Sequence, residues 1–243
     1  MKWTSGGWIT GTVRLRSALR RAGVTRHLSA VRSLLGAGVY EQSVDRALSP
    51  LVRIGDCVWD VGANVGLYTE RFAKAVGPSG TVVAFEPIAS TCRVLQERVC
   101  IFPNVQIRQE ALGAKQATLT VVLDDDPTSP TNSLTRTAAT VLGSSAPTQT
   151  VRIISGDELI ANADAPTPTV VKIDTEGFEE EVLWGMRDAL RSPQLRAILI
   201  EVHFSILENR GYRNAPSRLC SLLEDLQFKL RWVDPSHLLA NRT

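Results

Sequence analysis

The sequence of 243 residues has no apolar stretch near the ~20 residues that a membrane-spanning helix needs. Its four cysteines have neither the close spacing of a zinc site nor the density of a disulfide scaffold. No apolar segment follows Lys2 as a secretion signal would require, so we expect a cytoplasmic protein with reduced cysteines. Apolar residues make up 44% and charged residues 21%, which excludes global disorder and favours a globular protein.

Acidic residues are absent before Glu41, whereas seven Lys and Arg lie there. The remaining chain therefore has 20 of the 27 basic residues against all 25 acidic ones, a balance that argues against a nucleic-acid partner. Residues 12–35 have helical spacing of Leu and Ala. One hypothesis is a surface helix in peripheral contact with an anionic membrane. An ordinary packed helix with a solvated basic face and an organelle transit peptide are the alternatives.

Short apolar runs alternate with amphipathic helices after the basic leader. The runs cover residues 57–61, 81–85, 105–112, 169–173 and 197–202. Their near-continuous apolarity is typical of parallel strands covered on both faces, so we predict an α/β fold with a doubly wound, mostly parallel sheet. Residues 228–232 alternate between apolar and basic, which predicts an antiparallel edge strand, and 237–243 predict a short final one.

Two boundaries follow from the composition. We predict a helical N-terminal extension over residues 1–40 and one domain over 41–243. An insertion over 113–168 interrupts the domain. It contains expected strands at 118–123 and 150–154, separated by a long segment rich in Ser, Thr and Pro. Loops of this length are uncommon unless they are functional or disordered, so we expect a hairpin-like insertion with a mobile tip.

A glycine turn follows the first predicted strand. Gly62 permits a tight turn, Gly66 lets the next helix pack closely, and amides at the helix start are expected to point toward a ligand. Glu86 follows Gly66 by 20 residues, at the end of the next strand. A carboxylate at this position binds ribose hydroxyls in nucleoside-binding folds. We therefore predict a nucleoside cofactor.

The identity of the cofactor depends on the turn. A dinucleotide pyrophosphate favours G-x-G-x-x-G, whereas Ala63, Asn64 and Val65 separate Gly62 from Gly66 here. Asp60, just before the turn, would repel a pyrophosphate but attract an ammonium group. We therefore predict S-adenosylmethionine, with an NAD-dependent oxidoreductase as the alternative.

Polar side chains follow the last two parallel strands. Asp174 and Glu176 have i, i+2 spacing, as do Glu201 and His203, so each pair faces one side if its strand continues. His203 is the expected general base, because its ordinary pKa lies near neutrality; Asp174 would orient it or act as the base. Hard oxygen ligands would also suit Mg²⁺. We expect no metal, since Glu176 can instead bind amides where a helix begins.

The sequence resembles the FkbM-type S-adenosylmethionine-dependent methyltransferases. The resemblance lies in residues 59–69 (WDVGANVGLYT), 84–87 (AFEP), 110–112 (EAL), 172–177 (KIDTEG) and 200–203 (IEVH). It implies a seven-stranded, Rossmann-like class I methyltransferase fold. It also implies O-methylation of a hydroxyl on a sugar, such as a glycolipid, lipo-oligosaccharide or polysaccharide, or on a polyketide.

The resemblance also implies roles for individual residues. Asp60 and the 62–64 turn would hold the methionine part of the cofactor, Glu86 the ribose, and Glu110 with Ala111 would flank the adenine. Asn132 and Ser133 resemble a family element that faces the substrate, where Glu176 and Glu201 are further candidates. A methyltransferase fold without activity, which binds a partner through the insertion and the basic leader, is the remaining alternative. The sequence predicts no particular oligomeric state.

Overall fold

A computed structural model describes residues 44, 46–123 and 147–242. The strands of the central sheet are β1 (Cys57–Val61), β2 (Thr81–Phe85), β3 (Val105–Arg108), β7 (Val170–Ile173), β8 (Ala197–Glu201), β9 (Lys229–Trp232) and β10 (His237–Asn241). The helices are α4 (Leu67–Val76), α5 (Ala89–Val99), α6 (Gly156–Ala161), α7 (Glu179–Gly185), α8 (Phe204–Asn209) and α9 (Ala215–Asp225), with single 3-10 turns at Ser49–Leu51 and Ala189–Arg191.

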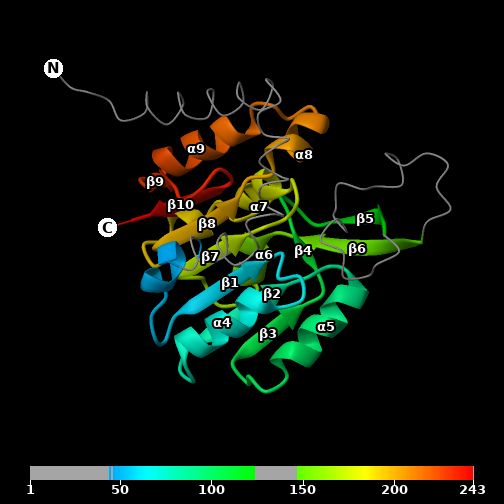
Figure 1. Cartoon of the computed structure of the whole chain (residues 1–243), viewed down its shortest axis with the longest axis vertical. Helices are drawn as coiled ribbons and strands as arrows, with labels where there is room; N and C mark the ends of the chain where they lie inside the picture. The colour runs from blue at the N-terminus through cyan, green and yellow to red at the C-terminus, as the bar shows by residue number, and fades with distance from the viewer. Residues whose placement is uncertain (1–43, 45, 124–146, 243) are drawn as a thin grey trace, which may run out of the picture.

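The central sheet has the strand order β3-β2-β1-β7-β8-β10-β9 (Figure 1). The strands from β3 to β8 are parallel, and β10 runs antiparallel to both β8 and β9 at one edge. The chain moves outward from β1 to β3 and then crosses back to β7 beside β1. This reversal creates a topological switch point between β1 and β7. In sheets of this kind, ligands bind at the switch point, outside the carboxyl ends of the strands. The predicted doubly wound, mostly parallel sheet is therefore confirmed.

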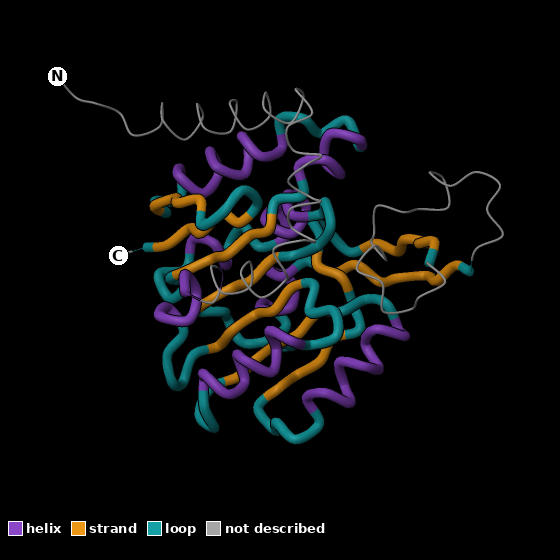
Figure 2. Tube along the Cα trace, in the orientation of Figure 1, coloured by secondary structure: helices purple, strands orange, loops and turns teal. Residues whose placement is uncertain are grey.

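Helices cover both faces of this sheet (Figure 2). Successive strand residues point to opposite faces, so Val58 packs with α4 and Trp59 packs on the other side. The face of Trp59 is covered by α6, α7 and α9, while α4 and α5 cover the face of Val58. Burial on both faces explains why the parallel strands are apolar along their whole length.

A small second sheet contains part of the predicted insertion. Its strands are β4 (Ala111–Leu112), β5 (Ala117–Val122) and β6 (Thr148–Ile154), in the order β4-β6-β5. The antiparallel pair β5–β6 confirms the expected hairpin, and Figure 1 shows it to one side of the central sheet. The single strand predicted over residues 105–112 is wrong, because β3 ends at Arg108 and β4 pairs with β6 instead. Asn132 and Ser133 lie outside the described residues, as does the predicted helix over residues 12–35.

The C-terminal elements largely follow the sequence pattern. The edge strand is β9, and the short final strand is β10, which lies between β8 and β9. Helix α7 is shorter than the stripe of apolar residues with helical spacing that extends from Phe178 to Leu190. It ends at Gly185, and a 3-10 turn at Ala189–Arg191 carries the stripe onward to Leu190. Among the described residues, no helix combines the length and the apolarity needed to cross a membrane.

The glycine turn joins β1 to α4 at the switch point. Gly62 has a φ of 78°, and a Cβ there would lie 1.9 Å from the carbonyl oxygen of Asp174. Gly66 has a φ of 83°, and a Cβ there would lie 2.5 Å from the Leu95 side chain on α5. The end of β1 therefore lies against the end of β7 only because residue 62 has no side chain.

We predict that Gly62→Ala lowers the free energy of unfolding by roughly 2–4 kcal/mol, because a backbone clash adds to the cost of a positive φ. Gly211→Ala is the matched control, since Gly211 also has a positive φ (82°) but a Cβ there would meet nothing within 4 Å. It should cost only about 1 kcal/mol. Urea denaturation measures both values, and equal losses would show that contact with Asp174 is not the constraint.

Candidate functional site

The backbone amides of the glycine turn are all hydrogen-bonded within the chain. Gly62 and Ala63 both donate to the carbonyl of Phe85 at 3.0 Å, and Gly66 donates to Ala63. Asn64 donates to Glu86 Oε2 at 3.0 Å, and Val65 donates to the Asn64 side chain. None of these five amides is left for a phosphate group, whereas the expectation that amides at the start of α4 point toward a ligand stays a prediction.

Glu86 joins the ends of the first two strands. Its Oε2 accepts the Asn64 amide, and its Oε1 accepts the Ile88 amide at 2.9 Å. Burial raises the pKa of Glu86 to about 7, against the effect of the two amide hydrogen bonds. Each carboxylate oxygen has two lone pairs, so one acceptor position on each remains for a further donor such as a ribose hydroxyl.

Glu110 and Ala111 lie where β3 leads into the small sheet. Glu110 is 8% exposed, and its carboxylate contacts Arg108 Nε at 3.0 Å and an Arg152 guanidinium nitrogen at 3.3 Å. Ala111 is buried against Ile88 and the strands of the hairpin. These contacts tie β3 to β6. The role of both residues beside an adenine stays a prediction.

Two charged residues face each other inside the parallel sheet. Asp60 on β1 is the register partner of Lys172 on β7, and both are buried. Lys172 Nζ lies 3.5 Å from Asp60 Oδ1 and 3.3 Å from Asp174 Oδ2, while Thr69 donates to Asp60 Oδ2 at 2.6 Å. Burial lowers the pKa of Lys172, but Asp174 and Asp60 outweigh it and raise the pKa overall. Because Asp60 is fully buried, its carboxylate neutralises Lys172, and its predicted contact with a cofactor ammonium stays a prediction.

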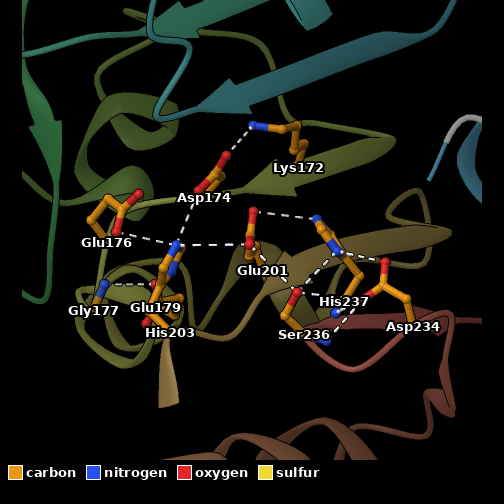
Figure 3. Close-up of polar contacts among 10 residues, drawn as sticks. All are labelled: Lys172, Asp174, Glu176, Gly177, Glu179, Glu201, His203, Asp234, Ser236 and His237. Atoms are coloured by element: carbon orange, nitrogen blue, oxygen red, sulfur yellow. Dashed lines mark hydrogen bonds and ion pairs between the residues drawn. The ribbon is translucent and has the colours of Figure 1, made fainter. Parts of the chain in front are cut away.

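His203 lies among carboxylates from two neighbouring strand ends (Figure 3). Its Nδ1 is 2.8 Å from Glu179 Oε1, and its Nε2 is 3.3 Å from Glu176 Oε2 and 3.7 Å from Asp174 Oδ1. The predicted convergence is therefore present, although β7 ends at Ile173 and Glu176 has a φ of 51°. The amide of Gly177, which we assigned to Glu176, instead donates to Glu179 at 2.8 Å.

The surroundings of His203 determine its protonation. Burial lowers its pKa, but the carboxylates of Glu176 and Glu179 outweigh burial and raise it to about 11. Both ring nitrogens then donate to carboxylates, and neither has a lone pair free to accept a proton. This arrangement disfavours His203 as a general base.

Asp174, Glu176 and His203 also form a candidate donor set for a cation. One ligand atom from each lies within 4.8 Å of the others. Two carboxylate oxygens and an imidazole nitrogen suit several divalent ions. The same groups are connected to one another and to Lys172 without an ion, and our expectation that no metal is required stays a prediction.

Glu201 belongs to a second histidine–carboxylate group. His237 is its register partner on β10, with Nε2 3.4 Å from Glu201 Oε2. Asp234 Oδ2 lies 2.9 Å from His237 Nδ1, and the Ser236 hydroxyl lies 3.4 Å from Glu201 Oε1. Glu201 Oε1 is 4.0 Å from His203 Nε2, so the two groups adjoin (Figure 3).

Sequence reasoning missed several residues of the site. Lys172 carried a visible signal, because it is a charge inside an apolar strand. Glu179 carried none, since nothing in the sequence distinguishes it from the adjacent Glu180 and Glu181. Two helices and an edge strand separate His237 and Asp234 from the other polar residues in the sequence, so only the tertiary fold brings them near Glu201.

Together, the fold and the site define an α/β nucleoside-binding protein with an acidic cluster at the carboxyl edge of its sheet. The model of the FkbM methyltransferase domain matches residues 60–230. The chain therefore belongs to the FkbM methyltransferase family.

Two relatives and one solved structure illustrate the similarity. The hexuronic acid methyltransferase AglP of Haloferax volcanii is 32% identical, covering 72% of this chain and 66% of its own. The 31-O-demethyl-FK506 methyltransferase FkbM of Streptomyces tacrolimicus is 28% identical, over 63% of this chain and 67% of its own. Fibrillarin of Aeropyrum pernix, crystallised with S-adenosyl-L-methionine, has a TM-score of 0.48 at 14% identity, covering 78% of this chain and 67% of that one. We draw no functional conclusion from a structural likeness at this level.

We predict that the free energy of unfolding decreases as the pH rises from 7.5 to 9. Burial lowers the pKa of His237, but Asp234 and Glu201 raise it to about 9, while that of His203 is about 11. An unfolded histidine releases its proton near pH 6.5, so the stabilisation is complete below that value and is lost as the pH passes each folded pKa.

Each histidine lowers the free energy of unfolding by about 1.4 kcal/mol per pH unit over the range in which only the folded state keeps the proton. His237→Gln should therefore halve the slope over this range, as followed by urea denaturation at several pH values. An unchanged slope would show that His237 is neutral in the folded protein.

Proposed function

We propose that this protein transfers a methyl group from S-adenosylmethionine to a hydroxyl of a sugar or a polyketide, with a sugar hydroxyl as the preferred acceptor. The observation that carries the proposal is the position of Asp174, Glu176 and His203. They lie at the carboxyl ends of β7 and β8, beside the turn that follows β1 and next to the switch point of the sheet.

The residues around the switch point suit a phosphate-free nucleoside. Glu86 keeps acceptor capacity at the end of β2, where a ribose binds in related folds. The five turn amides are hydrogen-bonded within the chain, so they offer no cradle for a pyrophosphate. This is an argument against NAD, whose pyrophosphate normally lies at such a turn.

Bound S-adenosylmethionine would supply an activated methyl group. The chain must then place the acceptor oxygen in line and accept its proton as the new bond forms. In this proposal Asp174 is the base that accepts the proton of the acceptor hydroxyl. Its side chain is 31% exposed and faces the cluster. His203, 13% exposed and bound on both ring nitrogens, orients Asp174 through Nε2.

The acceptor class is supported by the relatives. One is named for a hexuronic acid, which is a sugar, and the other for 31-O-demethyl-FK506, a polyketide. A hydroxyl of a glycolipid or lipo-oligosaccharide would suit a protein that also contacts an anionic membrane through residues 12–35. That contact is part of the proposal and not of the described structure.

We predict that isothermal titration calorimetry detects binding of S-adenosylhomocysteine and not of NAD. Glu86→Ala should weaken this binding at least about tenfold, since it removes hydrogen bonds of roughly 1.5–3 kcal/mol to the ribose. The matched control is Glu97→Ala, an exposed position on α5. No heat with the folded wild-type protein would exclude the proposed function.

We predict that Asp174→Asn reduces methyl transfer by ~10²–10⁴-fold with little change in S-adenosylhomocysteine affinity, because it removes a base. His203→Gln should cause a smaller loss, as expected for a residue that orients the base. Asp225→Asn, on the exposed face of α9, is the control. Transfer of a tritiated methyl group to a panel of sugars and glycolipids measures the rate. A larger loss in His203→Gln than in Asp174→Asn would return the role of base to His203.

A further inference from the structure

The loop between β9 and β10 contributes side chains to the candidate active site. The match to the FkbM domain ends at residue 230, so Asp234, Ser236 and His237 lie beyond it. Ser236 and His237 nevertheless contact Glu201, at the carboxyl end of β8, and Asp234 contacts His237 (Figure 3).

Asp234 fixes the conformation of this loop. Its Oδ1 accepts the amides of Ser236 and His237, both at 2.8 Å, while its Oδ2 contacts His237 Nδ1 at 2.9 Å. These bonds orient the imidazole so that Nε2 faces Glu201 Oε2 at 3.4 Å. His237 is 5% exposed and Glu201 is 8% exposed, so the pair is shielded from water and its attraction is only weakly screened.

Glu201 lies between two imidazoles. Its Oε2 faces His237, while its Oε1 is 4.0 Å from His203 Nε2, only slightly farther than Asp174 Oδ1 at 3.7 Å. A buried carboxylate that loses a nearby cation interacts more strongly with the remaining cations or gives up its charge. Without His237, the nearest described imidazole for Glu201 is that of His203, where it would compete with Asp174.

We propose that His237 is a positioning residue for methyl transfer, which holds Glu201 away from His203 so that His203 Nε2 remains directed at Asp174 and Glu176. Asp234 and Ser236 support it, Asp234 by orienting the ring and Ser236 by contacting Glu201 Oε1. This inference rests on the proposed function, and it extends the site to residues that the matched domain does not include.

The test compares single and double variants at pH 7. His237→Gln should lower kcat at least about tenfold, because a small displacement of the reacting groups is costly. The dissociation constant of S-adenosylhomocysteine should stay within about twofold, since Glu86 is not affected. Asp234→Asn should change kcat in the same direction, and Lys229→Gln, exposed on the adjacent strand β9, should change neither.

The double variant separates positioning from general stability. If His237 acts through Glu201, His237→Gln should have little further effect on kcat once Glu201→Gln has removed the charge. Equal losses of kcat in both backgrounds, or an unchanged kcat in His237→Gln, would overturn the proposal.

A nuclear magnetic resonance measurement reports on the proposal without turnover. The chain has three histidines, so the ring ¹⁵N signals can be assigned by substitution. His237→Gln should shift the His203 ring signals, whereas Lys229→Gln should not. An unchanged His203 signal in a folded His237→Gln variant would overturn the proposal. Failure of the proposed function would appear differently, as a wild-type protein that neither binds S-adenosylhomocysteine nor transfers methyl groups.

Discussion

The site depends on Lys172, a buried cation between two carboxylates. Asp60 pairs with it across the sheet, and Asp174 receives it at the point where β7 ends. Removing one partner of a buried ion pair typically costs 3–5 kcal/mol, because a buried charge is left uncompensated. Lys172 therefore couples the interior of the sheet to its reactive edge. The carboxylate of Asp174 is held by the same cation that allows β1 to contain an aspartate.

Carboxylates and histidines also alternate from Asp174 toward β10. Glu176 and Glu179 surround His203, and Glu201 lies between His203 and His237. Each carboxylate thus has a cation within reach, which is how so many acids can lie near one another with little exposure to water. The cluster is consequently one electrostatic unit, in which both histidines lie close to Glu201.

The larger features of the fold were predictable from the sequence because they depend on local patterns. A segment of about 20 residues is enough to recognise each of them: the apolar strands, the glycine turn and the spacing from Gly66 to Glu86. The break between β3 and β4 lies within residues 105–112, where apolar and polar residues are mixed and do not mark a clear boundary. It is determined by pairing with β6, more than 30 residues later.

The site was predictable only in part, because some of its contacts also depend on residues far apart in the sequence. Asp174, Glu176, Glu201 and His203 follow strands whose neighbourhood can be inferred from the topology. Glu179 and His237 could not be distinguished from ordinary surface residues, because their roles arise from a helix turn and from a strand added at the edge. The protonation of His203 was also beyond prediction, since it depends on how many carboxylates surround the ring.

The glycine turn has a consequence for the catalytic cycle. Its amides bind Phe85, Glu86 and neighbouring atoms of the turn itself, so hydrogen bonds within the chain hold its shape. A spent donor can therefore leave and a fresh one enter without the loop having to unfold and form again. Donor exchange at this edge of the sheet should then be limited by diffusion and desolvation and not by a rearrangement of this turn.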